Sequence, residues 1–326
     1  MNRTDGNYIP DAEDIHLAHA RIRARIRVTP VINDPALDEI LGCRLFCKCE
    51  NLQRAGAFKF RGASNAVARL RETGMEGAVA THSSGNHGAA LSLAARLDGR
   101  AAHVVMPQNS SRLKIEAVRG FGGQVHFCAP GNEARTEALD DLVRGGMIPV
   151  HPYDDADIIA GQGTAALELE QTVPSLEQVI TPVGGGGLIS GTAIATRAWG
   201  VSVFGVEPAG AADTVESLRR GEIVTSIRPD TIADGLRAIV GRRNFQVIGE
   251  YVSAVMTVSD EEIRTAMILV WKTLRLLIEP SSATVIAAIA RHPEVFSGHK
   301  VGAILSGGNI DPAEWCALTG TATNEG

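Results

Sequence analysis

The sequence lacks a long hydrophobic run and a block of basic residues. No segment approaches the ~18 consecutive apolar residues that a membrane-spanning helix requires. The net charge is −6, which disfavours nucleic acid as a partner. Residues 1–14 are polar and have no apolar core of the kind that a secretion signal contains. These absences predict a cytoplasmic protein that binds neither membranes nor nucleic acid.

Cysteine is also scarce, with five in 326 residues. An odd number of cysteines in a protein expected to be cytoplasmic predicts reduced thiols rather than a disulfide framework. Cys43, Cys47 and Cys49 cluster, but no second Cys/His pair has the spacing of zinc ligands. Buried structural thiols are therefore the better interpretation. A Gly-x-Ser-x-Gly motif is absent as well, which disfavours a hydrolase triad.

Short apolar segments alternate with helix signals along most of the chain. Strands are predicted at 44–49, 78–81, 102–106, 124–127, 178–183, 201–206 and 300–305. Helices are predicted at 11–26 and from about residues 87, 111, 132, 188 and 214. Repeated β-α-β units imply a mostly parallel sheet covered by helices. The length suggests two domains, but spacing alone does not locate their boundary.

One lysine stands out because of its neighbours. Lys59 lies between Phe58 and Phe60 in the run GAFKFRG, residues 56–62. An ammonium group in apolar surroundings is costly, so its pKa falls and the neutral amine becomes a nucleophile. A lysine that forms a Schiff base needs this property. Taken alone, the run favours a simpler interpretation, in which the stem packs in a strand and the ammonium reaches water.

A run of four glycines follows a predicted strand and opens a predicted helix. Such a loop lets backbone N–H groups approach an anion, and a helix N-terminus favours negative charge. The dinucleotide fingerprint fails at Ile189 or Ser190, and a P-loop fails because Thr192 stands where lysine is required. The loop therefore predicts a site for a single phosphate, with a flexible turn as the alternative. Its residues are Gly184, Gly185, Gly186, Gly187 and Leu188.

Two more polar loops follow predicted strands. The run SSGNHG, residues 83–88, offers small side chains and free N–H groups that could hold a carboxylate, and it could equally cap a helix. The run SGGN, residues 306–309, suits a tight turn as well as a binding loop.

Together these motifs resemble the serine racemase and serine/threonine dehydratase family of pyridoxal-phosphate enzymes. The likeness extends from about Thr29 to about Asp311, with Ala57 where the family motif has serine. It implies fold type II: two mostly parallel, three-layer α/β domains with pyridoxal 5'-phosphate in the cleft. The larger domain would comprise residues 1–70 and 155–326, and the smaller, mobile domain residues 71–154.

The resemblance also implies roles for individual residues. Lys59 would hold the cofactor and take the Cα proton, with Phe58, Asn86, the glycine loop and Ser306 as further cofactor contacts. Ser84 would be the acid/base on the opposite face, and serine there points to the racemase-like branch. The residues implied to bind substrate are Ser83, Ser84, Gly85, Asn86, His87 and Arg135. Arg135 could pair with a substrate side-chain carboxylate, or lie as a charge on a helix surface.

Glu207, Ala211 and Asp213 form a further candidate site. Two carboxylates with a backbone carbonyl between them supply hard oxygen ligands, which suit Mg²⁺ or Ca²⁺. By spacing alone a solvated acidic loop is the better interpretation. The resemblance matches these three residues to a divalent-cation site for Mg²⁺, Ca²⁺ or Mn²⁺.

The sequence as a whole predicts a pyridoxal-phosphate dehydratase, or ammonia-lyase, of small β-hydroxy amino acids. L-Serine, L-threonine and 3-hydroxyaspartate remain open as substrates, and the products would be a 2-oxo acid and ammonia. A dedicated serine racemase is one alternative, and a non-catalytic phosphate-ligand binding module is another. The resemblance further implies a homodimer.

Overall fold

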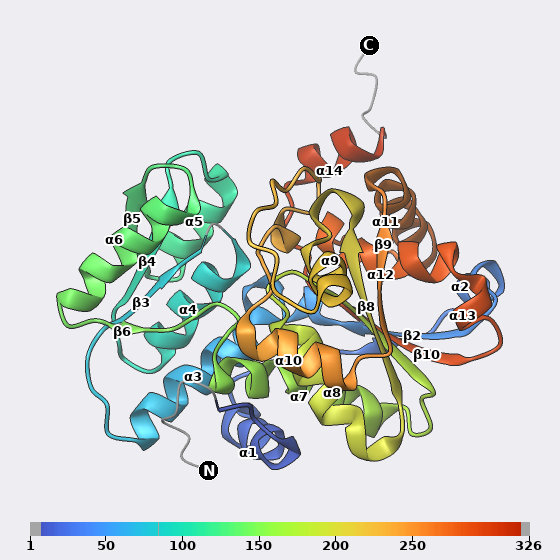
Figure 1. Cartoon of the computed structure of the whole chain (residues 1–326), viewed down its shortest axis with the longest axis horizontal. Coiled ribbons are helices and arrows are strands. Elements are labelled where there is room, and N and C mark those ends of the chain that lie inside the picture. Colours follow the sequence, from blue (N-terminus) through green and yellow to red (C-terminus); the bar gives the residue numbers. More distant parts are fainter. Residues whose placement is uncertain (1–7, 84, 321–326) are drawn as a thin grey trace.

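Two sheets form the frame of two lobes that lie side by side (Figure 1). The structure is a computed structural model that describes residues 8–83 and 85–320. The larger sheet contains, in spatial order, β1 (Val31–Ile32), β2 (Arg44–Cys49), β10 (Lys300–Leu305), β7 (Gln178–Pro182), β8 (Ser202–Pro208) and β9 (Ala254–Val258). Its neighbouring strands are parallel except β1 and β2. The α/β architecture predicted from the sequence is confirmed.

The smaller sheet is entirely parallel. Its spatial order is β5 (Gln124–Cys128), β4 (Ala102–Pro107), β3 (Val79–His82) and β6 (Ile148–Pro149). The helices between these strands are α4 (Asn86–Leu97), α5 (Arg112–Gly120) and α6 (Asn132–Arg144). This lobe is built from one continuous piece of chain, which lies within the segment 71–154 expected to form the smaller domain.

Helices cover both faces of the larger sheet because its strands are buried on both sides. Along β10, Val301, Ala303 and Leu305 enter one core while Ile304 enters the other, the two-residue alternation of a strand. On the first face lie α2 (Pro35–Leu41), α11 (Asp260–Leu274), α12 (Pro280–Arg291) and α14 (Pro312–Thr319). On the second lie α1 (Ala12–Ile22), α7 (Ala156–Thr172), α8 (Gly187–Thr196) and α10 (Arg242–Tyr251).

The remaining helices are α3 (Lys59–Glu72), α9 (Asp213–Arg220) and α13 (Pro293–Phe296). Of these, α3 matters most for the site because it connects the lobes. Its residues Phe60, Ala63 and Val67 share a core with α4 and with Ile158 of α7. The first residue of α3 is Lys59, so the packing of this helix determines where the lysine lies.

Helix starts agree with the sequence better than helix ends. Asp11 caps α1 through a reciprocal capping box with Asp14. The helix ends at Ile22 rather than near residue 26, because Arg25 and Ile26 both donate to the Ile22 carbonyl and close a turn.

The described residues also bear on two of the predicted absences. Within residues 8–83 and 85–320, no helix is long and apolar enough to cross a membrane. Cys47 and Cys49 are fully buried in β2, and burial raises the pKa of the Cys49 thiol to about 12. A thiol with this pKa stays protonated and unreactive at neutral pH.

Candidate functional site

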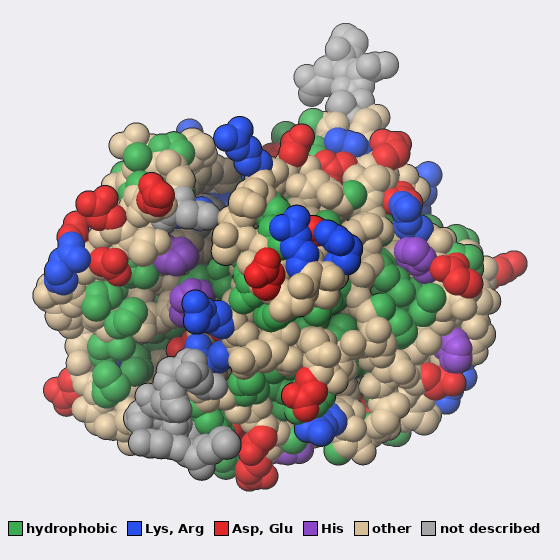
Figure 2. Space-filling model, viewed as in Figure 1, with side chains coloured by type: hydrophobic (Ala, Val, Ile, Leu, Met, Phe, Trp, Pro, Cys, Tyr) green, Lys and Arg blue, Asp and Glu red, His purple; other side chains and the backbone are tan. Residues whose placement is uncertain are grey.

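A cavity of about 660 Å³ is lined by residues of both lobes. Figure 2 shows the groove between the lobes, with histidine and basic side chains along it. The predicted cofactor and substrate residues that line this cavity are Phe58, Lys59, Ser83, Gly85, Asn86, His87, Arg135, Gly184, Gly185, Gly186, Gly187, Leu188 and Ser306. The fold thus brings together motifs that lie far apart in the sequence. Ser84, predicted as the second acid/base, lies outside the described residues.

Lys59 begins α3 and faces this cavity. Its Nζ donates a hydrogen bond of 2.9 Å to the carbonyl of Pro152 and lies 5.1 Å from the centre of the Phe58 ring. Burial lowers the pKa of the Lys59 amine to about 8. A substantial fraction of the amine is therefore neutral near physiological pH, as a Schiff-base nucleophile requires.

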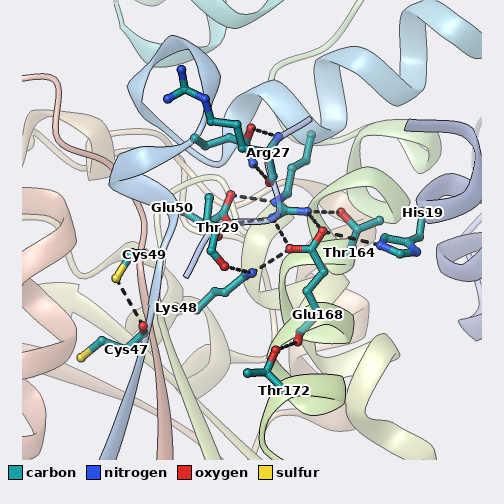
Figure 3. A network of polar contacts seen from close by, with 12 residues as sticks. His19, Arg27, Thr29, Cys47, Lys48, Cys49, Glu50, Thr164, Glu168 and Thr172 are labelled. Carbon is teal, nitrogen blue, oxygen red and sulfur yellow. Dashed lines mark hydrogen bonds and ion pairs between the residues drawn. The ribbon is translucent and has the colours of Figure 1, made fainter. Parts of the chain in front are cut away.

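A buried network of charges anchors the first turn of α3 (Figure 3). The guanidinium of Arg61 makes a two-point ion pair with Glu50 at 2.7 and 2.8 Å. The same group donates to both carboxylate oxygens of Glu168 in α7, at 2.9 and 2.7 Å. Lys48 of β2 adds a 2.7 Å bond to Glu168 and a 2.8 Å bond to the carbonyl of Thr29. Two cations thus balance two carboxylates, and α3 is joined to β2 and α7.

The glycine loop can pack as it does only because it lacks side chains. A Cβ at Gly185 would lie 2.2 Å from the ring of Tyr153, and a Cβ at Gly187 would lie 3.0 Å from the Tyr153 carbonyl. Gly186 has a φ of +90°, in the left-handed region that favours glycine. The side chain of Asn244 donates to the carbonyl of Gly185 at 2.7 Å, which fixes the loop from behind.

This loop fits a phosphate group. It opens α8, and the first four N–H groups of a helix have no partner within the helix. The residues of α8 are all buried and none is charged before Arg197, so within this helix the N-terminal N–H groups, not a charged side chain, supply positive potential. The Gly184–Gly187 backbone would therefore hold the phosphate of pyridoxal 5'-phosphate.

The polar loop after β3 contacts both lobes. Asn86, the first residue of α4, donates through its side-chain nitrogen to Glu279 at 2.7 Å and accepts from Asn309 at 2.9 Å. Burial, followed by the charge of Asp234, raises the pKa of Glu279 to about 7. His87 is also buried, and burial followed by the nearby Lys59 holds its pKa well below the usual value. His87 is therefore a neutral imidazole in this site.

Ser306 directly follows the last strand, β10, and lies beside the segment that carries Lys59. Its carbonyl accepts the backbone N–H of Phe58 at 3.0 Å, and Gly307 forms a bridge with Ala57. The Ser306 segment is thus attached directly to the segment that carries Lys59. A Cβ at Gly307 would lie 2.3 Å from a carboxyl oxygen of Glu279, so a side chain there would displace the Glu279 carboxyl group.

Glu207, Ala211 and Asp213 lie close together but do not line the cavity. Glu207 accepts the N–H groups of Thr214 and Val215 at 3.0 Å each. Burial and the charge of Asp213 raise the pKa of Glu207 to about 8, and burial raises that of Asp213 to about 6.

The donor set fits a hard cation. One oxygen of Asp213, Oδ1, is buried without a hydrogen-bond partner among the described residues. A buried, unpartnered carboxylate oxygen beside a second carboxylate is what a divalent cation would compensate. The other oxygen, Oδ2, accepts the N–H of Val240 at 2.9 Å. The neighbouring Gly241 donates to the carbonyl of Gly185 at 3.1 Å, so this site is connected to the glycine loop.

Arg135 lines the cavity from α6 and donates to the carbonyl of Gly131 at 3.2 Å.

The structure adds lining residues that the sequence did not indicate. Lys114 of α5 pairs with Asp234 across the lobes. His82, Pro152 and His151 also line the cavity. His82 directly precedes the polar loop 83–88, so its position in the sequence indicates a place in the site, whereas no local motif points to the other residues.

The comparisons with known proteins agree with this geometry. The family described as pyridoxal-phosphate dependent enzyme matches residues 22–307. A β-hydroxyaspartate dehydratase from Paracoccus denitrificans is 45% identical over 93% of this chain and 98% of its own. A serine racemase from Dictyostelium discoideum is 45% identical over 92% of this chain and 94% of its own. The structure of maize serine racemase matches with a TM-score of 0.91 and 38% identity, covering 96% of this chain and 98% of that one.

Proposed function

Because this chain belongs to the family of pyridoxal-phosphate dependent enzymes, we propose that it is a dehydratase of small β-hydroxy amino acids. The overall reaction converts the substrate to a 2-oxo acid and ammonia: water leaves from Cα and Cβ, and water then hydrolyses the product. The observation that carries the proposal is the Lys59 amine, which faces the cavity with a pKa lowered to about 8. A non-catalytic phosphate-binding module has no need for such an amine.

Each residue of the proposed site has a separate role in the reaction. When bound, the cofactor supplies an electron sink that stabilises negative charge at the substrate Cα. The Nζ of Lys59, once free, accepts the Cα proton, and its low pKa keeps it available as a base. The Gly184–Gly187 loop would hold the phosphate, and Ser306 would supply a neutral hydroxyl partner for the pyridine nitrogen. Residues 83–87 would hold the substrate carboxylate.

A second activity, serine racemisation, is favoured by one observation on the relatives. Serine racemases from several organisms are 39–45% identical to this chain over more than nine-tenths of its length. Ser84 is the candidate for the proton donor on the face opposite Lys59. Elimination and racemisation both begin with loss of the Cα proton, so one enzyme can perform both.

Further proposals concern a cation site and the division of the chain into domains. We assign a divalent cation, Mg²⁺ before Ca²⁺ or Mn²⁺, to Glu207, Ala211 and Asp213, because Asp213 Oδ1 is buried without a partner in the described chain. We assign residues 71–154 to a smaller domain that moves against the rest. A homodimer and a cytoplasmic location remain predictions from the sequence.

The test is turnover of a defined panel by the purified protein. The panel contains L-serine, L-threonine, D-serine and both diastereomers of 3-hydroxyaspartate, with release of 2-oxo acid as the readout. Wild type should absorb in the visible, borohydride should fix the cofactor to Lys59, and Lys59→Ala should abolish both colour and turnover. Lys272→Ala, an exposed lysine of α11, is the matched control. A colourless active protein, or cofactor fixed to another lysine, would show that the assignment is wrong.

A further inference from the structure

The turn between β6 and α7 is held by one histidine ring. Nδ1 of His151 accepts the backbone N–H of Tyr153 at 3.3 Å and that of Asp154 at 2.9 Å. Since Nδ1 accepts two hydrogen bonds, it carries no proton, and the neutral ring has its proton on Nε2. The ring also meets the ring of Tyr153 edge-on, with centroids 4.7 Å apart at 87°.

This turn contacts three separate parts of the site. The carbonyl of Pro152 accepts the 2.9 Å hydrogen bond from Lys59. The ring of Tyr153 lies against the glycine loop at Gly185, where no Cβ would fit. The carboxylate of Asp154 accepts the N–H groups of Arg242 and Arg243 at 3.0 and 3.1 Å, which caps α10. A displacement of the turn would therefore move the partner of the lysine and the wall of the phosphate loop together.

We propose that His151 is a positioning residue: its Nδ1 lone pair holds the turn that presents the Pro152 carbonyl to Lys59 and the Tyr153 ring to the glycine loop. The inference rests on the proposed function for its activity readout, but the contacts themselves do not depend on it. Without the acceptor, two partly buried backbone N–H groups lose their partner, and this loss favours reorganisation of the turn.

The same geometry makes the turn sensitive to acid. A protonated ring has no lone pair and would direct an Nδ1–H at two other donors. Burial, followed by the charge of His82, lowers the pKa of His151 to about 4. The titratable and charged groups that face this ring come from four elements and the turn itself: His82, Lys59, His87, Asp154, Arg243 and Tyr153.

The sign of the effect follows from this lowered pKa. The folded protein binds the His151 proton less readily than the unfolded chain, whose value is near 6.5. The stabilising contribution of the neutral ring is therefore complete above about pH 6.5 and is lost as the pH falls towards about 4.

Two substitutions separate the acceptor from the titration. In His151→Asn, Oδ1 is attached to Cγ as Nδ1 is, so it can accept the same two N–H groups but does not titrate. His151→Leu removes the acceptor. His16→Gln, at an exposed position of α1, is the control for loss of a histidine. Each protein is stripped of cofactor, and the attachment of added pyridoxal 5'-phosphate is followed by visible absorption from about pH 4 to about pH 8. Values of kcat and KM are measured on the best substrate of the panel.

In His151→Leu we expect attachment to slow and kcat to fall by about 10²-fold, the usual effect of a 1 Å misplacement in an active site, with a smaller change in KM. His151→Asn should restore both. It should keep the rise with pH that Lys59 causes in every variant, and lose only the additional fall below about pH 6.5 that wild type and His16→Gln share. Equal effects of Asn and Leu, or an additional fall below about pH 6.5 that persists in His151→Asn, would overturn the proposal.

Two further comparisons test the role of His151 if a variant does not fold or if the proposed activity is absent. If His151→Leu does not fold, the comparison of His151→Asn with wild type across the pH range still decides, since only one of them titrates. If wild type acts on none of the panel, the proposed function fails. The attachment of cofactor to Lys59 then tests the role of His151 by itself.

Discussion

The ammonium of Lys59 donates to the carbonyl of Pro152 at 2.9 Å, and this bond joins the first residue of α3 to the turn that precedes α7. No carboxylate accepts a hydrogen bond from this ammonium within the described residues. A carbonyl stabilises the charged form much less than a carboxylate does, so burial determines the pKa. The arrangement holds the amine in place without making it a permanent cation.

The first prediction concerns the pH dependence of cofactor attachment. Only the neutral amine attacks an aldehyde, and burial lowers the pKa of Lys59 to about 8. The rate at which pyridoxal 5'-phosphate attaches to stripped protein should therefore rise with pH and level off above about pH 8. Stopped-flow absorption in the visible measures it. A rate that keeps rising to the ordinary lysine value of 10.5 would contradict the burial of the amine.

The second prediction concerns the buried charges around Arg61. Glu168→Gln leaves Lys48 and Arg61 with one carboxylate fewer, and breaking a buried pair costs about 3–5 kcal/mol. The free energy of unfolding from urea titration should fall by about that amount. Glu314→Gln, at an exposed position of α14, should change it by less than about 0.5 kcal/mol.

A double variant tests whether charge balance is the cause. In Lys48→Met combined with Glu168→Leu, one cation and one carboxylate leave together, and Arg61 keeps its two-point pair with Glu50. This protein should be more stable than Glu168→Gln alone. If it is equally unstable or less stable, packing rather than uncompensated charge explains the loss.

The third prediction concerns the cation. Without metal, Glu207 has a pKa raised from 4.5 to about 8, so stability is lost as the pH rises through that window. Mg²⁺ should counter this loss, by about 2.7 kcal/mol at a concentration of 100 times Kd. The melting temperature with Mg²⁺ and with chelator, at pH values near the two ends of the window, measures the difference.

Asp213→Asn should remove the response to Mg²⁺, whereas Glu222→Gln, an exposed carboxylate nearby in the sequence, should keep it. If chelator changes neither melting temperature nor activity of the wild type, the cation assignment is wrong. Protonation of Glu207 alone would then relieve the repulsion between the two carboxyl groups.

The fourth prediction separates elimination from racemisation. Only racemisation needs a second acid/base on the face opposite Lys59, and a positioned acid/base contributes a factor of about 10²–10⁴. Ser84→Ala should keep most release of 2-oxo acid from L-substrate and lose formation of D-serine by about that factor. Both products are measured in the same reaction. Equal loss of both would mean that the hydroxyl serves substrate binding instead.

The architecture could be predicted from sequence because its signals are local. The strands at 44–49 and 300–305 were predicted with the bounds that β2 and β10 have, since most residues of both segments are apolar. Strand β9 was not predicted. Its residues Ala254–Val258 are mostly half-exposed at the edge of the sheet, and Thr257 interrupts the apolar run. The helix that follows β9 begins with a capping box formed by Ser259 and Glu262, and this motif can be recognised in the sequence.

The site was predictable only where a motif carries the chemistry in consecutive residues. Lys59, the glycine loop and Ser306 belong to such runs. The contacts that position Lys59 do not belong to such runs. Pro152, which accepts its hydrogen bond, is 93 residues away in the sequence, and Glu168, which pairs with Arg61 of the same helix, is 107 residues from Arg61. His151 acts through its backbone neighbours in a turn, which leaves no distinctive pattern.

The place of β10 in the larger sheet has a consequence for biosynthesis. This strand lies between β2 and β7, and Lys300 pairs with Arg44. A ribosome delivers residue 300 only after nearly the whole chain has been made, so until then β1 is the one neighbour that β2 has among the described strands. The four strands of the smaller sheet are complete by residue 149. The nascent chain therefore carries a fully paired small sheet beside an unpaired edge of β2, and such an edge can pair with other chains until β10 is made.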